Sequence, residues 1–181
     1  MKKKLLFWFI VGILAVPALM FQSCDKAEEL TKIDVNYDAP DVPLTLSLSG
    51  GQKATIVVTS QMITANVDSL LKAHNLDVVD NIKAKAMQLL VDDPADANFD
   101  FMESATVKLL VEGKEDIVVA NTGSIQPGVK NIDLVVADLN SVKDYVGAGG
   151  FQLQLEVVTK SELPADPLKL ILKHQYQITI K

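Results

Sequence analysis

Alternation of hydrophobic and polar residues dominates the chain and predicts a mainly β fold. In residues 43–49, PLTLSLS, leucines alternate with threonine and serines, so one face of the segment is apolar and the other polar. The same period of two recurs in further segments. Candidate strands cover residues 43–49, 53–60, 81–91, 105–113, 116–121, 131–136, 151–160 and 167–181. About eight strands, each burying one face, fit a two-layer antiparallel β-sandwich of the immunoglobulin-like kind better than a parallel sheet.

Two features of this pattern predict how the strands pair. The Gly50-Gly51 pair favours a turn, so we expect residues 43–49 and 53–60 to form a hairpin. The last segment has apolar residues on one parity, with lysines and glutamines mostly opposite. This stripe consists of Leu168, Leu170, Leu172, His174, Tyr176, Ile178 and Ile180. We expect the stripe to face the core and its strand to pair with residues 151–160.

Two segments break the period of two and predict short helices. In residues 66–75, NVDSLLKAHN, apolar residues recur at helical spacing, and Asn66 stands where an N-cap belongs. Residues 139–147, LNSVKDYVG, show the same spacing, and Gly147 suits a C-cap.

The start of the chain has a different hydropathy from the rest. Three lysines at positions 2 to 4 precede an uncharged apolar run from Leu5 to Phe21. A helix of that length rises about 1.5 Å per residue and is shorter than the roughly 30 Å core of a bilayer. A basic start, a short apolar run and a small residue at its end are typical of a secretory signal that is removed on maturation.

This run ends at the only cysteine of the chain. Phe21-Gln22-Ser23-Cys24 resembles the lipobox of bacterial lipoproteins, in which the cysteine becomes the lipidated first residue of the mature protein. Phe21 replaces the usual leucine, a relaxation found in some bacterial groups. The resemblance implies lipid on Cys24 and an anchor in the outer membrane, facing the periplasm or the cell surface. A signal anchor with Cys24 as a bystander is the alternative, but exported chains normally pair their cysteines.

The segment after Cys24 is acidic and predicts a tether. Residues 25–42, DKAEELTKIDVNYDAPDV, contain few large apolar side chains, and as a flexible coil they span on the order of 25 Å. The alternating Ile33, Val35 and Tyr37 also allow an edge strand. The acidic start is similar to stretches in surface-exported lipoproteins of some Bacteroidota, and a plain solvated linker is the alternative.

The predicted organisation therefore has three parts. Residues 1–23 form the signal peptide, residues 24–42 the acidic tether and residues 43–181 a β-sandwich domain. The last part has the size of a single domain and buries about two-thirds of its unfolded surface, enough for a core without disulfides.

Charge argues against nucleic acid as a partner. The mature chain keeps all 23 acids and loses three of the 17 lysines, so its formal charge falls from -6 to about −9. The chain contains no arginine, the usual residue for bidentate contacts to phosphate and guanine. An acidic surface is also repelled by phosphate chains.

The acidic stretch DDPADANFD, residues 92–100, is the strongest candidate for metal binding. Asp96, Asn98 and Asp100 place oxygen ligands at alternate positions, as at the start of an EF-hand calcium loop. The resemblance ends there, because Phe101 stands where glycine is needed and Val107 where a bidentate glutamate belongs. We treat the three residues as weak metal candidates and expect no resident metal or cofactor.

Other residues give no pattern of a catalytic or cofactor site. His74 and His174 lack the spacing of metal ligands, and each lies on an apolar stripe, as a core or rim histidine does. The GAGG segment at 147–150 follows a helical pattern and precedes a strand, the reverse of a phosphate-binding loop. No serine lies in a G-x-S-x-G context. Aromatic residues are too few after the signal to indicate a sugar-binding platform.

These observations predict a non-enzymatic lipoprotein that acts as a binding or assembly module on the bacterial envelope. It would contact the membrane through lipid on Cys24 and also bind a protein partner of the envelope. The alternative is a carrier of apolar ligands such as lipid or fatty acid, because residues 78–91 and 168–178 are rich in aliphatic side chains. An enzyme is the third option, since no set of acid, base and nucleophile is evident.

Replacing Cys24 with alanine tests the lipid anchor. We expect Cys24→Ala to move the protein from the membrane fraction to the soluble fraction of cells, because no other residue of the motif accepts lipid. Immunoblotting of the two fractions measures the shift. Retention of Cys24→Ala in the membrane fraction would contradict the lipoprotein interpretation.

Overall fold

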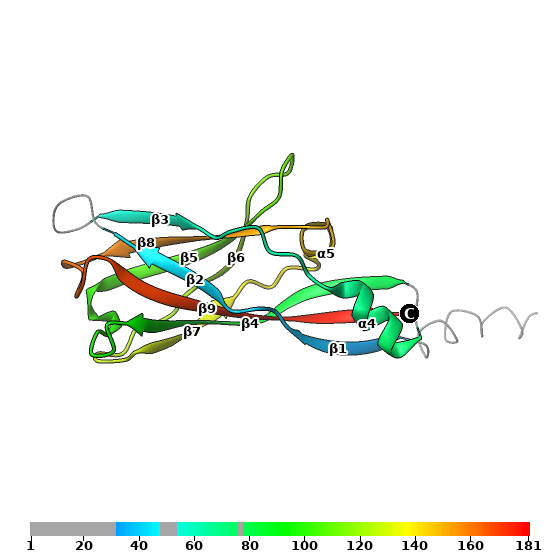
Figure 1. The fold of residues 1–181 in the computed structure, drawn as a ribbon, viewed down its shortest axis with the longest axis horizontal. Helices are drawn as coiled ribbons and strands as arrows, with labels where there is room; N and C mark the ends of the chain where they lie inside the picture. Colours follow the sequence, from blue (N-terminus) through cyan, green and yellow to red (C-terminus); the bar gives the residue numbers. More distant parts are fainter. Residues whose placement is uncertain (1–31, 48–53, 76–77) are drawn as a thin grey trace, which may run out of the picture. The chain divides into compact units, whose positions relative to one another are not determined.

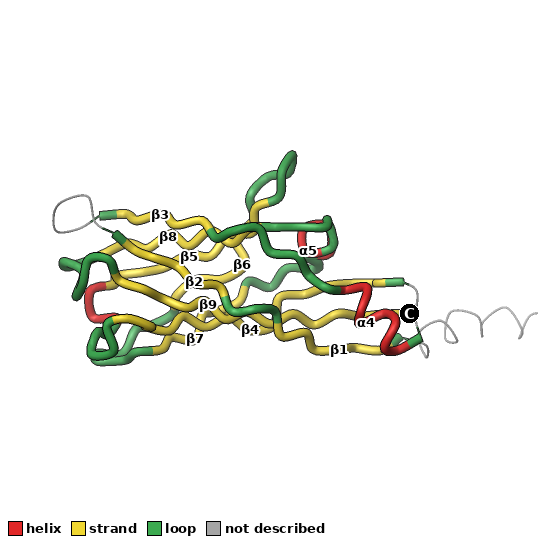
Figure 2. Tube along the Cα trace, viewed as in Figure 1, coloured by secondary structure: helices red, strands yellow, loops and turns green. Residues whose placement is uncertain are grey.

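The computed structural model describes residues 32–47, 54–75 and 78–181, and within them Asp34–Ile180 forms one compact unit. Nine described strands, all antiparallel, make one continuous sheet (Figures 1 and 2). The strands are β1 (Ile33–Asp38), β2 (Val42–Leu46), β3 (Thr55–Thr59), β4 (Val79–Asp93), β5 (Met102–Leu110), β6 (Ile117–Thr122), β7 (Asn131–Val136), β8 (Gln152–Thr159) and β9 (Leu168–Ile180). The mainly β class predicted from the alternation is confirmed. The strand order does not by itself assign the sheet to the immunoglobulin-like kind.

The sheet curls into a sandwich-like arrangement. Its strand order is β1-β9-β4-β7-β6-β5-β8-β3, with β2 also paired to β9. Figure 1 shows β3, β8, β5 and β6 on one side of the molecule, with β9, β4, β7 and β1 on the other. The last strand of this order, β3, also contacts β2, although no ladder of backbone hydrogen bonds joins these two strands. The apolar faces therefore meet between the two groups of strands.

The core follows the alternation that the sequence shows. Along β9 every residue of the predicted stripe is buried, and the residues between them are exposed or half-buried. The strand β8 alternates in the same way. The largest side chains with no more than a trace of exposure include Tyr176, Phe99 and Phe151. The predicted core face of the C-terminal strand is thus confirmed.

Both predicted strand pairings are wrong. The strand β9 pairs with β4 on one edge and with β1 and β2 on the other, while β8 lies between β5 and β3. Likewise β2 pairs with β9 and β3 pairs with β8. The two strands of each predicted pair, β2 with β3 and β8 with β9, therefore belong to different layers of the sandwich. Alternation fixes which face is buried, but an apolar face is equally well covered by either layer. Gly50-Gly51 lies outside the described residues.

The first predicted helix is confirmed as α4 (Val67–His74), where the side chain of Asn66 accepts a hydrogen bond from the Ser69 amide at 3.3 Å. The second, α5 (Lys143–Val146), starts later than its pattern predicts. Just before this start the Val142 amide donates to the carbonyl of Ile82 and so ties the helix to β4. A 3-10 turn, η1 (Phe99–Phe101), precedes β5. No helix within the described ranges is long and apolar enough to cross a membrane.

The sheet begins inside the segment that we expect to act as a tether. Ile33–Asp38 forms the edge strand β1, as the alternation in this segment allows. Its polar side chains bind β9, since Gln177 donates to Asp34 at 2.9 Å and Gln175 donates to Asp38 at 2.6 Å. Its Tyr37 packs against the core. The residues from 34 onward therefore belong to the folded unit.

The contrast between two neighbouring residues of β9 provides a test of the fold. Leu172 has 0% exposure, and Lys173 is exposed. We expect Leu172→Ala to lower the free energy of unfolding by about 2–5 kcal/mol, because it loses buried apolar surface and leaves a cavity. We expect Lys173→Ala to stay within about 0.5 kcal/mol. Chemical denaturation of both variants measures the difference, and equal losses would contradict the one-sided burial of β9.

Candidate functional site

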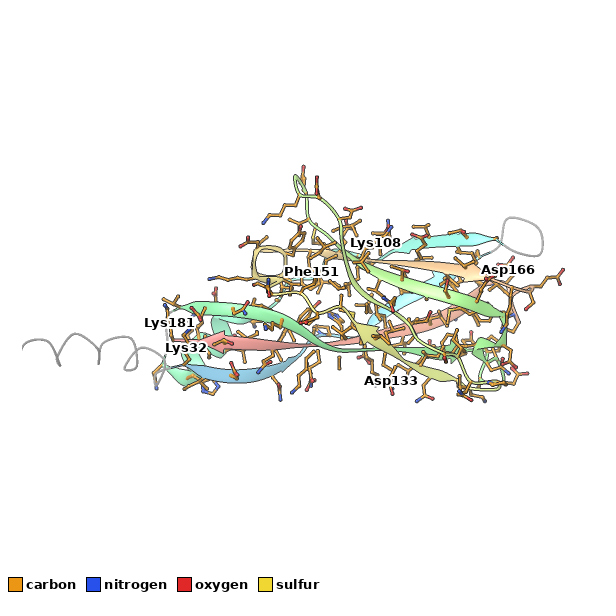
Figure 3. The ribbon with its side chains drawn as sticks, turned by 180° about the vertical axis from the view of Figure 1, so that it is seen from behind. Lys32, Lys108, Asp133, Phe151, Asp166 and Lys181 are labelled. Carbon is orange, nitrogen blue, oxygen red and sulfur yellow. The ribbon has the colours of Figure 1, made fainter. Side chains whose placement is uncertain are left out.

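Polar side chains cover the outer face of β1, β9, β4 and β7. Hydrogen bonds between strands organise this face, and they join amides or lysine to carboxylates and amide oxygens. The pairs are Gln88 with Asp133, Gln175 with Asp38, Gln177 with Asp34, and Lys85 with Asn36. Figure 3 shows Asp133 at the outer side of β7. These bonds tie the polar side chains of the four strands to one another.

A hollow of about 420 Å³ opens in this face, and we call it the outer hollow. It lies where β4, β7 and β9 meet the crossover Ala39–Asp41, which joins β1 to β2. Small side chains at Ala39 and Ala86 make room for it, and the register of β4 against β9 shifts between Ala84 and Ala86. Its polar lining consists of Asp38, Asp41, Gln88, Asp133, Lys173 and Gln175.

Hydrogen-bond acceptors outnumber donors in the outer hollow. A carboxylate only accepts, so the amide nitrogens of Gln88 and Gln175 point to their aspartate partners and the amide oxygens remain as acceptors. Each aspartate uses one carboxylate oxygen in these bonds. The only lysine of the lining, Lys173, places its Nζ 4.0 Å from Asp41 Oδ2, too far for a strong hydrogen bond. The lining therefore suits a ligand that brings donors and positive charge.

His174 lies at the buried end of the outer hollow, with 4% exposure. Its Nε2 is 3.1 Å from the carbonyl oxygen of Pro40, and its Nδ1 is 3.2 Å from the hydroxyl of Tyr176. A carbonyl only accepts, so Nε2 carries the proton and donates. Nδ1 then accepts from the tyrosine hydroxyl. Both nitrogens are satisfied, but only while the ring is neutral.

The surroundings of the ring hold it in the neutral form. Burial lowers the pKa of His174 from 6.5 to about 4, against smaller opposing effects of the Pro40 carbonyl and Asp41. Burial also raises the pKa of Tyr176 far above its usual range, so its hydroxyl stays a donor. Phe151 packs edge-on against both rings with centroids 6.2 Å away. A charged imidazole at this place has only Asp41 as a favourable charge.

Two of the three weak metal candidates, Asn98 and Asp100, serve local structure in the described chain. The Asn98 side chain accepts from the Asp100 amide at 2.9 Å, and Asp100 Oδ1 accepts from the Gly128 amide at 2.8 Å. Asp96 is exposed in the preceding turn. Across the part of the chain that the structure describes, no three His, Cys, Asp or Glu side chains are grouped as metal ligands would be.

The other sequence candidates lie apart from the outer hollow. His74 is exposed on α4, so only His174 takes the core position that both apolar stripes allowed. The 147–150 segment is a turn, with Gly149 at a φ of 85°. Gly150 permits a close approach, since a Cβ there would lie 2.9 Å from the Met62 sulfur. Met62 itself is 64% exposed and borders two further hollows of about 340 and 680 Å³.

Apart from His174, the residues of the outer hollow are not among the candidates from sequence. Asp38, Gln88, Asp133 and Lys173 each stand at an ordinary polar position of an alternating strand, and they are far apart along the chain. Only the pairing of β7, β4, β9 and the crossover brings them together. The irregular segment Asp38-Ala39-Pro40-Asp41, which interrupts two alternating runs, is the one local signal of an unusual backbone.

No protein family model, curated protein or solved structure matches the chain. Cys24 and the rest of the predicted signal lie outside the described residues, so lipidation stays a prediction. The function therefore has to be inferred from the chemistry of this chain alone.

The pKa of His174 predicts an acid-dependent stability. Unfolding returns the ring to a pKa of 6.5, whereas the folded value is about 4. The stability contributed by the neutral ring is complete above pH 6.5 and is lost as pH falls to about 4, because only the unfolded chain gains a proton in that range. The shift corresponds to about 3 kcal/mol.

Comparison with His174→Gln isolates this effect from that of the carboxylates. Glutamine has an N–H to offer Pro40 but no proton to gain. We expect the free energy of unfolding to fall more steeply between pH 6.5 and 4 for the wild type than for the variant. Urea denaturation at a series of pH values measures both slopes. Parallel slopes would show that His174 is not held neutral.

Proposed function

We propose that the protein is a lipoprotein of the bacterial envelope that acts as a non-enzymatic binding module. In this proposal lipid on Cys24 holds it to the outer membrane, and the outer hollow receives basic side chains of a protein partner. The anchor is supported by the Ser23-Cys24 motif after a short apolar run. The binding role is carried by one observation, the surplus of acceptors in the outer hollow.

The chemistry of the hollow favours ammonium or guanidinium groups. Asp38, Asp41 and Asp133 face a single lysine there, and the mature chain as a whole is acidic. Charge-assisted hydrogen bonds to carboxylates are stronger than neutral ones, and long-range attraction speeds the encounter. The lining has no Trp, Tyr or Phe on which a sugar ring would stack. A basic protein surface is therefore favoured over a carbohydrate.

The length of the tether limits where the partner can be. Seven residues, 25 to 31, separate Cys24 from the first described residue. Fully extended, they reach at most roughly 25 Å. A lipid on Cys24 would thus keep the folded unit within about its own diameter of the membrane surface. This supports a partner that is itself part of the envelope.

The interior and the histidine support a surface-binding role over the other two options. Tyr176, Phe99 and Phe151 fill the space between the layers, so an apolar ligand carried inside would have to displace them. His174 has both ring nitrogens bonded to neighbours in the core. It therefore presents no base to a ligand in the outer hollow.

Titration with hexa-lysine, followed by NMR amide shifts of the protein in neutral detergent, tests the proposed site. We expect shifts at Gln88, Asp133, Lys173 and Gln175 at low salt, weakening at high salt because exposed charges are screened. Hexa-glutamate serves as the matched peptide control. Shifts spread over the whole surface, or confined to another face, would contradict a site in the outer hollow.

A pair of charge reversals sharpens this test. Asp133→Lys places a positive charge in the outer hollow, and we expect it to weaken hexa-lysine binding at least tenfold. Glu162→Lys makes the same change in net charge at an exposed position between β8 and β9, away from the hollow lining. Equal weakening by both variants would show that only net charge matters. Saturable binding of a fluorescent fatty acid would favour the carrier function instead.

A further inference from the structure

The crossover Ala39–Asp41 is held to β9 by two hydrogen bonds of one residue. The Ala39 amide donates to the His174 carbonyl at 3.2 Å, and His174 Nε2 donates to the Pro40 carbonyl at 3.1 Å. On either side of the crossover, β1 and β2 pair with the same edge of β9. His174 therefore fixes the point at which the chain passes from one strand to the next.

The two sides of the His174 ring have different surroundings. On the core side Tyr176 and Phe151 stand edge-on to it, and both are buried. On the other side the crossover covers it, and the outer hollow lies beyond. A charged ring could reach water by displacing a few residues of the crossover, whereas the core side is closed by packed side chains. Opening on the crossover side is therefore the smaller rearrangement.

Protonation breaks the hydrogen-bond arrangement of the neutral ring. A proton on Nδ1 meets the donating hydroxyl of Tyr176, which must then turn its hydrogen into an apolar core. The charged groups near the ring are those that line the outer hollow, Asp38, Asp41, Asp133 and Lys173, while Tyr37 lies by Tyr176. The Pro40 carbonyl and Asp41 both favour the cation, but the penalty of burial outweighs them. Hydration is the remaining source of stabilisation.

We propose that His174 is an acid-sensitive latch, in which a proton taken up from solvent on Nδ1 releases the crossover from β9 and opens the wall of the outer hollow. The crossover carries Asp41 and adjoins Asp38 at the end of β1, so release moves Asp41 and alters the set of carboxylates that would bind a basic partner. Acid then switches off the binding site while the remaining strands stay paired. The effect on binding rests on the proposed function, but the latch itself rests only on the geometry around His174.

An NMR titration of the full protein in neutral detergent from pH 7 to pH 3.5 tests the latch. The His174 ring, the amide exchange of Ala39 and that of β8 amides such as Leu155 are followed together, with exchange corrected for its intrinsic pH dependence. We expect Ala39 to lose at least tenfold protection with the same midpoint as the ring, while Leu155 stays protected. Ala39 remaining protected through the ring titration would overturn the latch. Loss of protection by Ala39 and Leu155 together would overturn it too, since it would mean global unfolding.

The His174→Gln variant and the hexa-lysine probe separate the two proposals. In the variant we expect no acid transition at Ala39, and an unchanged transition would show that carboxylates cause it. Hexa-lysine binding at pH 7 tests the outer hollow alone. If hexa-lysine does not bind, the proposed function is refuted, but the amide-exchange test of the latch is unaffected. If wild type and variant lose binding identically between pH 7 and pH 3.5, the latch does not regulate the site. A steeper loss in the wild type supports the regulation.

Discussion

The packing of β9 between two edges of the sheet is the constraint on which the rest of the structure depends. This strand pairs with β4 along most of its length, and its opposite edge is shared by β1 and β2. Its buried face supplies leucines at one end and Tyr176 with isoleucines at the other. Removing any one partner would leave backbone donors of a central strand without partners, which is costly away from water. The position of β9 also explains why the outer hollow exists, because β1 and β2 cannot share one edge without a crossover between them.

The neutral histidine is the unusual element of this core. Histidine is less often fully buried than the aliphatic residues, and here each ring nitrogen has a single partner of the matching kind. A leucine at this position would continue the apolar stripe but would leave the Pro40 carbonyl without its donor. The imidazole thus has two structural roles. It fills space in the core, and it fixes the irregular backbone between β1 and β2.

The faces of the strands could be predicted from the sequence, whereas their partners could not. Leu168 to Ile180 alternate so regularly that the buried parity follows directly, and Asn66 marks the start of α4 by its capping chemistry. Whether β9 pairs with β8 or with β4 depends on which layer each connection enters, and short-range pattern contains no such information. The same holds for the outer hollow, because Asp38, Gln88 and Asp133 become neighbours only through long-range pairing. The apolar stripe predicts His174 as a core residue. Its partner Pro40 lies 134 positions earlier in the chain, and no local pattern predicts the contact between them.

If the chain is anchored through Cys24 as proposed, the order of β1, crossover and β2 along one edge has a mechanical consequence. Tension applied through the tether acts first on β1, an edge strand of six residues that is bonded to a single neighbour. The next attachment is the pair of hydrogen bonds at His174. Peeling β1 would lengthen the tether by roughly 20 Å before the force reached β2 and the core. Under such a load the edge strand would act as a short extensible segment, and the hydrogen bonds of His174 would resist further extension.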